Sequence, residues 1–441
     1  MTQLGRQVRA SANHQFLTIE GWKRLDALKP GEFIALPRTL EGIDDADVKI
    51  NDNQAALLGH LLGDGCTLPR HAVQYTTNDP TLANLVAVLA TEIFGETVEP
   101  RIVRERQWFQ VYLSAAEHLT HGKRNPVAEW LETLGAWGYR SHEKRVPEAL
   151  FAQPSRIIAR FLRHLWTTDG TMGVFGQKRP RAVITYTTSS EALAQDVQHL
   201  LLRLGIIART HRVPQRGRGR DQWHVVITGK PDVTAFLDKI GVLSSKENVA
   251  LKIQEFYRDR THNTNRDVIP KQVWKSLVEP ARRQSGVSQR EFQAALGTQY
   301  CGTALFKSNL SRERALKVGE IVASEELIQL AQSDLYWDKI ASLDPDGEED
   351  VYDVTVPGHH NFIAGDIIVH NSLEQDADIV MFIYRDELYN ENSENPNIAD
   401  VMIAKHRSGP TGTVQLYFNK RLTQFLDAAT HVSPNDYSLG P

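Results

Sequence analysis

The feature that most constrains the fold is an internal duplication in the first half of this 441-residue chain. The segment LLGHLLGDG at 57–65, with the stretches that follow it up to residue 113, recurs between residues 161 and 228, where the second copy begins FLRHLWTTDG. Each copy shows a helical pattern, a strand-like run, a second helical pattern and a pair of strands. A repeated order of this kind indicates two similar halves.

The duplication places one aspartate at the end of each leading helix. Asp64 in the first copy corresponds to Asp169 in the second. Gly59 and Gly63 lie four residues apart in the first helix, and such small residues let two helix backbones approach closely. If the two leading helices pack together, both carboxylates lie side by side. They would repel each other and the helix dipoles, and Mg²⁺, which binds carboxylates, water and phosphate oxygens, offsets that repulsion.

From residue 46 to residue 250 the chain resembles the double-motif LAGLIDADG homing endonucleases. The resemblance implies a pseudo-symmetric αββαββ fold in which Asp64 and Asp169 hold the metal ions for phosphodiester cleavage. The segment EKRVPEAL resembles the block that supplies an assisting lysine, so Lys144 is the candidate. His164 stands where the first motif has Gly59, a departure from the family pattern. The alternative is therefore an inactive endonuclease that only binds DNA.

Arginines lie in the strand pairs of both copies. The run RTHRVPQRGRGR at 209–220 contains five arginines and no acidic residue. Alone, such a run is typical of a solvated loop. Within the duplication it lies between two strands and matches RIVRER at 101–106, and arginine-bearing hairpins can follow phosphates and reach base edges. We therefore predict binding of double-stranded DNA by Arg101, Arg104, Arg106, Arg209, Arg212, Arg216, Arg218 and Arg220.

The sequence VYDVTVPGHHNFIAGDIIVHNS at 351–372 resembles the C-terminal splicing block of inteins. Asn371 can attack its own carbonyl through its side-chain nitrogen and release the bond to Ser372, whose hydroxyl accepts the upstream segment as an ester. His370 is placed to assist by proton transfer. The alternative for the HNS tripeptide alone is a turn prone to deamidation. Further candidates from the same resemblance are His359, His360 and Asp353.

The segment before the duplication resembles another intein block. His14 follows Ser11 by three residues, as in the pattern T-x-x-H with serine in place of threonine. Such inteins have a β-rich Hint fold interrupted by the endonuclease, which predicts residues 1–45 and 336–371 as two parts of an incomplete splicing domain. The upstream nucleophile is expected to be missing, because Met1 lies thirteen residues before His14. We therefore expect a truncated gene product or remnant that cannot complete splicing alone.

Residues 251–335 are expected to be mostly helical. Ser288 and Glu291 form a capping-box pattern, and helix starts are predicted at Ser311 and Ser324. A short helix, a turn and a second helix suggest a helix-turn-helix DNA reader. The alternative is a helical bundle that supports the splicing domain.

The last segment, 372–441, resembles the C-terminal strands of DnaB-type hexameric replicative helicases. In AKHRSGPTG, the resemblance implies that Lys405 and Arg407 reach the nucleotide of a neighbouring subunit. The chain has no G-x-x-x-x-G-K-[ST] motif, so we expect ATP binding and helicase subunit contacts only in the complete host protein. A third hypothesis is a helicase subunit that becomes active after ligation to a separately encoded upstream half.

Composition limits the remaining possibilities. The chain lacks an apolar run long enough to span a bilayer and lacks the apolar core of a secretion signal. Two cysteines cannot form a disulfide framework. We therefore expect an α+β multidomain protein of the cytoplasm, with no membrane partner.

Overall fold

The computed structural model describes most of the chain, which forms two compact units. The first unit contains most residues up to Gly347 together with Ile363–Ile368, and the second contains the C-terminal strands. The described residues are 1–40, 49–119, 123–217, 219–260, 266–299, 302–350, 354, 356, 360–370, 379–388, 390, 393, 395–406, 409–410, 412–420, 422 and 424–427. Among them, no helix is both long and apolar enough to cross a membrane.

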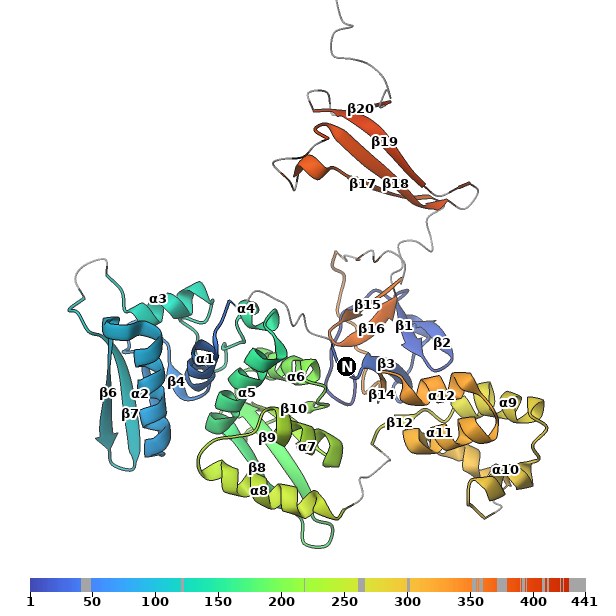
Figure 1. Cartoon of the computed structure of the whole chain (residues 1–441), viewed down its shortest axis with the longest axis horizontal. Helices are drawn as coiled ribbons and strands as arrows, with labels where there is room; N and C mark the ends of the chain where they lie inside the picture. The colour runs from blue at the N-terminus through green and yellow to red at the C-terminus, as the bar shows by residue number, and fades with distance from the viewer. Residues whose placement is uncertain are drawn as a thin grey trace, which may run out of the picture. The chain divides into compact units, whose positions relative to one another are not determined.

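The duplication corresponds to two copies of a helix, a strand hairpin, a second helix and a second hairpin (Figure 1). The first copy consists of α1 (Asp52–Asp64), β4 (Gly65–Cys66), β5 (Gln74–Thr77), α2 (Pro80–Phe94), β6 (Val98–Glu105) and β7 (Trp108–Ala115). The second consists of α5 (Ser155–Asp169), β8 (Gly170–Phe175), β9 (Arg181–Thr188), α6 (Glu191–Arg203), β10 (Arg209–Val213) and β11 (Gln222–Thr228). Each copy forms an antiparallel four-stranded sheet, with strand orders β4-β5-β7-β6 and β10-β11-β9-β8. The expected αββαββ order is therefore present.

Capping residues in the local sequence mark where these helices start. Asn51 and Gln54 form a capping box at α1, and Asp79 caps α2, whose first residue is Pro80. Ser190 caps α6 in the same way. Each cap accepts a hydrogen bond from a backbone N–H that would otherwise have no partner.

Both copies share one apolar core. Leu57, Leu58 and Leu61 of α1 are fully buried, as are Phe161 and Leu165 of α5. Helices α3 (Pro126–Thr133) and α4 (Glu148–Phe151) lie between the two copies in the sequence. Helices α7 (Lys230–Lys239) and α8 (Ser245–Arg258) follow the second copy. The sequence predicted that the endonuclease-like region ends at residue 250, which lies inside α8. This helix continues to Arg258 and buries Ile253 in the same core.

Strands from before and after the duplicated region pair with each other. One sheet has the order β15-β16-β1-β2, and β3 pairs antiparallel with β14. The short helix η1 (Leu25–Ala27) lies between β2 and β3. The strands are β1 (Gln15–Thr18), β2 (Gly21–Arg24), β3 (Phe33–Pro37), β14 (Leu335–Lys339), β15 (Asn361–Ala364) and β16 (Ile367–His370). The duplicated region is thus an insertion between two segments that fold together.

A separate helical module follows the second copy. Its core contains Trp274 and Phe292 together with Ala35 of β3 and Trp337 of β14, so the module packs on that strand pair. Its elements are β12 (Val268–Ile269), the π-helix Trp274–Val278, α9 (Glu279–Gln284), α10 (Gln289–Ala295), the 3₁₀-helix Gly302–Lys307, β13 (Leu310–Ser311), α11 (Arg312–Ile321) and α12 (Glu325–Gln332). The predicted caps are confirmed, because Ser288 and Glu291 form a capping box and Ser311 and Ser324 cap α11 and α12.

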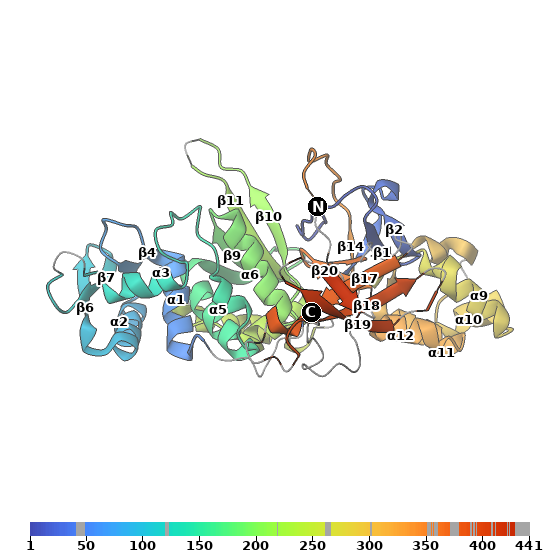
Figure 2. The ribbon, with the colours of Figure 1, turned by 90° about the horizontal axis from the view of Figure 1, so that it is seen from above.

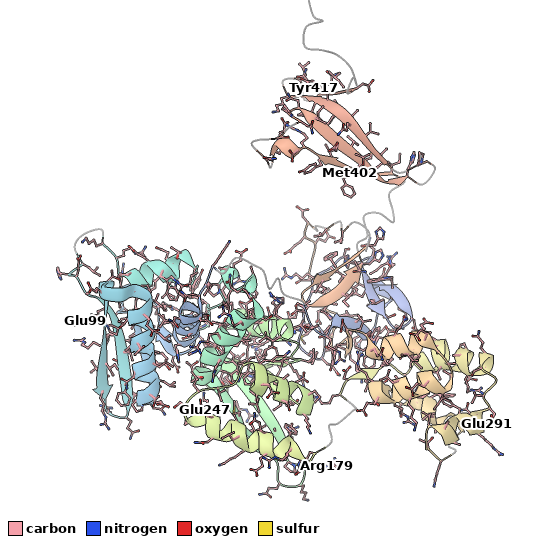
Figure 3. All side chains as sticks on the ribbon, viewed as in Figure 1. Glu99, Arg179, Glu247, Glu291, Met402 and Tyr417 are labelled. Carbon is pink, nitrogen blue, oxygen red and sulfur yellow. The ribbon has the colours of Figure 1, made fainter. Side chains whose placement is uncertain are left out.

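The C-terminal strands form an antiparallel sheet in sequence order. Many of its large apolar side chains are exposed; Met381 and Ile383 are each 58% accessible. Figure 3 labels two others, Met402 and Tyr417. The strands are β17 (Ile379–Tyr384), β18 (Ile398–His406), β19 (Gly412–Asn419) and β20 (Gln424–Asp427).

Candidate functional site

The site lies where α1 and α5 pack against each other (Figure 1). A Cβ atom at Gly59 would lie 2.7 Å from the Phe161 carbonyl oxygen and 2.9 Å from the His164 Cβ. A Cβ at Gly63 would lie 2.7 Å from the Thr168 Cβ. The backbone of α1 therefore approaches α5 closely. His164 departs from the motif pattern but is accommodated, because Gly59 lies opposite it.

The close packing brings the last residues of both helices into one electrostatic site. Burial raises the pKa of Asp64, and Lys144 and Lys246 partly offset this rise. Burial together with the charge of Asp64 raises the pKa of Asp169 to about 6. The charge of Asp64 therefore makes ionisation of Asp169 harder, as expected for two acids that lie near each other. Among the described residues, no third His, Cys, Asp or Glu joins them in a metal-ligand cluster.

The predicted Lys144 lies at the C-terminal end of α1. Its Nζ donates hydrogen bonds to the carbonyl oxygens of Leu61, Leu62, Gly63 and Gly65 at 2.9–3.2 Å. These are carbonyls at the end of a helix, where partners within the helix run out. Burial lowers the pKa of Lys144, and the two aspartates oppose this effect. Its ammonium group therefore supplies positive charge beside both carboxylates.

A second lysine, Lys246, does the same for α5 and was missed in the sequence. Its Nζ donates to the carbonyl oxygens of Trp166, Thr167 and Thr168 at 2.6–3.0 Å. Burial lowers its pKa, while Asp169 and Asp64 raise it. A signal existed, because Lys144 follows Gly63 by 81 residues and Lys246 follows Thr168 by 78. The similarity between the two copies ends at residue 228, before this lysine.

A buried polar network lies along the α1–α5 interface. His60 Nδ1 is 3.2 Å from the Tyr75 hydroxyl, and His60 Nε2 is 2.9 Å from His164 Nδ1. Burial lowers the pKa of His60 to about 3 and that of His164 to about 2. Both imidazoles are therefore neutral at neutral pH. The sequence drew attention only to the unusual position of His164.

In the first copy, strand pairing decides which arginines face away from the core. Opposite residues in a sheet share a face, and successive residues alternate between faces. Arg101 lies opposite Tyr112, with its guanidinium 5.3 Å from the ring centre. Val111, the next residue of β7, is fully buried. Arg101 therefore lies on the outward face, whereas Arg104, opposite Phe109, lies on the other face.

In the second copy, the outward face carries Arg209 and a histidine pair. His211 lies opposite His224, with ring centres 5.6 Å apart, and the neighbouring Val225 is buried. Arg212 lies on the other face and forms an ion pair with Asp221.

The remaining predicted arginines lie beyond these strand pairs. Arg106, in the β6–β7 turn, is exposed and has a positive φ of 54°. Arg216 and Arg220 are exposed between β10 and β11, and Figure 2 shows that hairpin projecting from its sheet. Arg218 lies outside the described residues.

The described splicing candidates His14, His360 and His370 lie next to or at the ends of strands. His14 directly precedes β1, and its ring makes an edge contact with Phe362 of β15, with centres 6.4 Å apart. His370 ends β16 and is buried, and β16 neighbours β1 in the sheet. His360 is exposed and has a positive φ of 52°. The candidates Asp353, His359, Asn371 and Ser372 lie outside the described residues.

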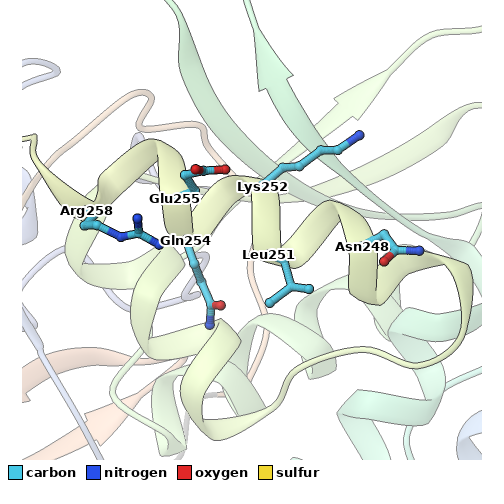
Figure 4. A pocket seen from close by; sticks show the side chains of 6 residues that line it. All are labelled: Asn248, Leu251, Lys252, Gln254, Glu255 and Arg258. Carbon is cyan, nitrogen blue, oxygen red and sulfur yellow. The ribbon is translucent and has the colours of Figure 1, made fainter.

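The predicted nucleotide contacts and a hollow on α8 lie outside the sites described above. Lys405 lies on β18 opposite Val380, and Arg407 lies outside the described residues. Figure 4 shows a hollow on the outer face of α8. It is lined by Asn248, Leu251, Lys252, Gln254, Glu255 and Arg258. None of the predicted catalytic residues lines this hollow.

Comparison with known proteins identifies two families in the chain. Residues 156–241 match the LAGLIDADG-like domain, and residues 358–427 match the DnaB-like helicase C terminal domain. The chain is 54% identical over 429 residues to the replicative DNA helicase DnaB of Nostoc sp., covering 97% of this chain and 49% of that protein. It is also 25% identical over 391 residues to Protein RecA of Mycobacterium bovis, covering 83% of this chain and 48% of that protein.

The chain therefore spans about half the length of the curated relatives it matches. Among solved structures, the homing endonuclease I-DmoI in complex with DNA and Mn is 16% identical, with a TM-score of 0.31, over 43% of this chain and 96% of that chain. The chain is therefore similar along nearly its whole length to DnaB homologues, with one segment that matches the LAGLIDADG-like domain and one that matches the DnaB-like helicase C terminal domain, a combination consistent with an intein-containing DnaB.

Proposed function

We propose that the duplicated region is a metal-dependent, site-specific DNA endonuclease. The observation that carries this proposal is the pair Asp64 and Asp169 at the ends of the packed helices α1 and α5, where the charge of Asp64 helps to raise the pKa of Asp169. Lys144 and Lys246 add positive charge at the two helix ends. A site with two acids and two fixed cations suits a reaction in which phosphate charge builds up.

A divalent cation such as Mg²⁺ fits the two carboxylates. Burial raises the pKa of both groups, and the charge of Asp64 adds to the rise at Asp169; a bound cation offsets both costs of ionisation. Mg²⁺ prefers one or two carboxylates with water and phosphate oxygens completing its shell. When bound, the metal activates water and stabilises the leaving oxygen. Asp64 and Asp169 would hold it, and the two lysines would stay beside the phosphate.

Double-stranded DNA is the proposed substrate. Arg101 and Arg209 lie on the outward faces of the two sheets, and exposed arginines continue into both hairpin turns. Arginines placed in this way can contact phosphates along one duplex and guanine edges within its major groove. The two similar halves suit a long target site in which each half is recognised separately.

The test is cleavage of plasmid DNA that carries the uninterrupted dnaB-type gene junction, with Mg²⁺ present. The matched control is the same plasmid with the junction interrupted by the coding sequence of residues 1–371. Cutting of the uninterrupted junction alone supports the endonuclease. Specific binding without cutting, by a chain shown to be folded, would favour the alternative of a DNA-binding remnant.

We further propose that the segments flanking the endonuclease are parts of a Hint-type splicing domain that cleaves at Asn371. Strands β1 and β16, which come from opposite sides of the insertion, are neighbours in one sheet. His14 directly precedes β1, and His370 is the last residue of β16. The alignment to RecA over 391 residues supports an insertion found in different host proteins, because the DnaB-like match covers only residues 358–427.

The test for splicing chemistry is mass spectrometry of the purified chain for a fragment that begins at Ser372. An Asn371→Ala chain is the matched control, because alanine cannot form the succinimide. Release from the parent chain and none from the control supports Asn371 cyclisation. Intact parent protein after long incubation would contradict it.

Helicase activity belongs to the proposed host protein. In the complete assembly, Lys405 and Arg407 would contact ATP bound by a neighbouring subunit, as arginine fingers do. For the helical module, packing on β3 and β14 favours support of the splicing domain over a separate DNA reader.

A further inference from the structure

The turn between β15 and β16 is held by buried charged groups from distant parts of the sequence. Gly365 and Asp366 both have positive φ, 55° and 61°, as in the tight turns that join twisted antiparallel strands. The Asp366 carboxylate accepts a hydrogen bond from Arg6 and one of 2.7 Å from Nδ1 of His199. Arg6 and Asp366 are 5% and 7% exposed. The turn is therefore tied to the start of the chain and to α6.

The segment Leu4–Gln7 is bonded on several sides. Arg6 also donates to the Gln198 carbonyl, and the Gln198 side chain donates to the carbonyls of Leu4 and Ala208 at 2.8 Å each. The Leu4 N–H donates to Asp338 at 2.9 Å.

Two glycines in this region allow close backbone contact. A side chain at Gly5 would collide with the Thr210 carbonyl, and one at Gly365 would collide with that of Gln7. The segment Leu4–Gln7 thus links the β15–β16 turn to α6 and β10 of the second copy.

The charge on Asp366 is maintained despite burial. Burial alone would raise the pKa of Asp366, but the His199 hydrogen bond and the Arg6 charge hold it below its usual value. Removal of either partner leaves a buried carboxylate with fewer compensating donors, which is unfavourable. The turn geometry therefore depends on all three residues together.

We propose that Arg6, Asp366 and His199 form a positioning clamp for the C-terminal splicing junction. This inference rests on the proposed cleavage at Asn371. Strand β16 begins directly after Asp366 and ends at His370, next to Asn371. Cyclisation requires the asparagine side-chain nitrogen to lie close to its own carbonyl carbon, and small displacements reduce the rate strongly. Because His199 belongs to α6, the endonuclease half helps to set the geometry of the splicing junction.

The test compares His199→Ala, His199→Asn and the control Gln195→Ala in the full chain. Gln195 lies one turn earlier on α6 and bonds Glu191 rather than Asp366. Release of the fragment starting at Ser372 is expected to slow at least ~10-fold in His199→Ala. His199→Asn should recover most of the rate, because its amide can donate in place of Nδ1. DNA cleavage should stay unchanged in all three, since neither His199 nor Gln195 is among the groups that shift the pKa of Asp64 or Asp169.

Hydrogen exchange of the β15–β16 amides gives a second, independent readout. His199→Ala and Asp366→Asn should exchange faster there than the parent, while α1 and α5 keep their protection. If the parent releases no fragment, the splicing proposal fails, and exchange alone decides whether the clamp exists. Parental release rates in His199→Ala, or parental exchange in β15–β16 of both variants, would overturn the clamp.

Discussion

The two halves of the duplicated region have the same order of helices and strands but different packing residues. Helix α1 presents Gly59 and Gly63 to its partner, whereas α5 presents His164 and Thr168. The helices still approach closely, because a glycine on one side makes room for a larger side chain on the other. The two copies are therefore alike in the aspartate and the lysine at the end of each leading helix. They differ in the side chains that α1 and α5 present to each other. A close helix pair needs small residues on only one helix at each contact.

The largest expected effect concerns the symmetric part of this comparison, the two acids. We expect Asp64→Asn and Asp169→Asn each to reduce DNA cleavage by roughly 10³-fold or more, because each removes a carboxylate that we propose to hold the metal ion. Plasmid cleavage with Mg²⁺ measures the rate, and DNA binding should persist. Asp238→Asn, at an exposed position of α7, is the control. Near-parental cleavage by either variant would mean that only one half carries the chemistry.

The asymmetric packing predicts a rescue. Gly63→Ala should destabilise the domain by about 1–3 kcal/mol, because the added methyl meets the Thr168 side chain. Thr168→Gly in the same chain should restore most of this stability, since the three atoms nearest to a Cβ at Gly63 all belong to that side chain. Gly59→Ala should not be rescued by His164→Gly, because the Phe161 carbonyl remains 2.7 Å from the new Cβ. Urea unfolding of the four chains distinguishes these outcomes.

The buried histidines predict a loss of stability in acid. In the folded chain, their pKa values of about 3 and about 2 lie below the ordinary histidine value of 6.5, so unfolding takes up protons below that pH. Stability should fall as pH drops from 6.5 toward 3, by roughly 1.4 kcal/mol per pH unit for each histidine.

Asp169 opposes this trend, because its raised pKa of about 6 makes folding take up a proton between pH 6 and 3.8. Unfolding is therefore best measured in an Asp169→Asn background. A His60→Gln and His164→Gln double variant in that background should lose the dependence. An unchanged slope would show that other groups cause it.

The smallest expected effect concerns single arginines on the sheets. Arg101→Ala and Arg209→Ala should weaken DNA binding several-fold, and each should lower the slope of log affinity against log salt by about 0.9 for one lost phosphate contact. Arg104→Ala and Arg212→Ala should matter less, because these residues lie on the other face of each sheet. Fluorescence anisotropy with duplex DNA at several salt concentrations measures both. Equal effects of all four would contradict the assignment of faces.

The sequence by itself determined the elements that depend on local pattern and on the repeat. The duplication predicted two similar halves and paired Asp64 with Asp169, and short-range caps such as Ser288, Ser311 and Ser324 placed helix starts. These features follow from periodicity and from hydrogen bonds within a few residues of each other. The motif near residue 144 likewise identified one lysine.

Only the tertiary structure decided what depends on partners distant in sequence. Lys246 acquires its role from the carbonyls at the end of α5, and His60 acquires its environment from Tyr75 and His164. Strand pairing separated Arg101 from Arg104 by face, and the first residues of the chain were found bonded to Asp366. A side chain's burial, charge state and partners are set by the segments that pack around it, and no local pattern contains that information.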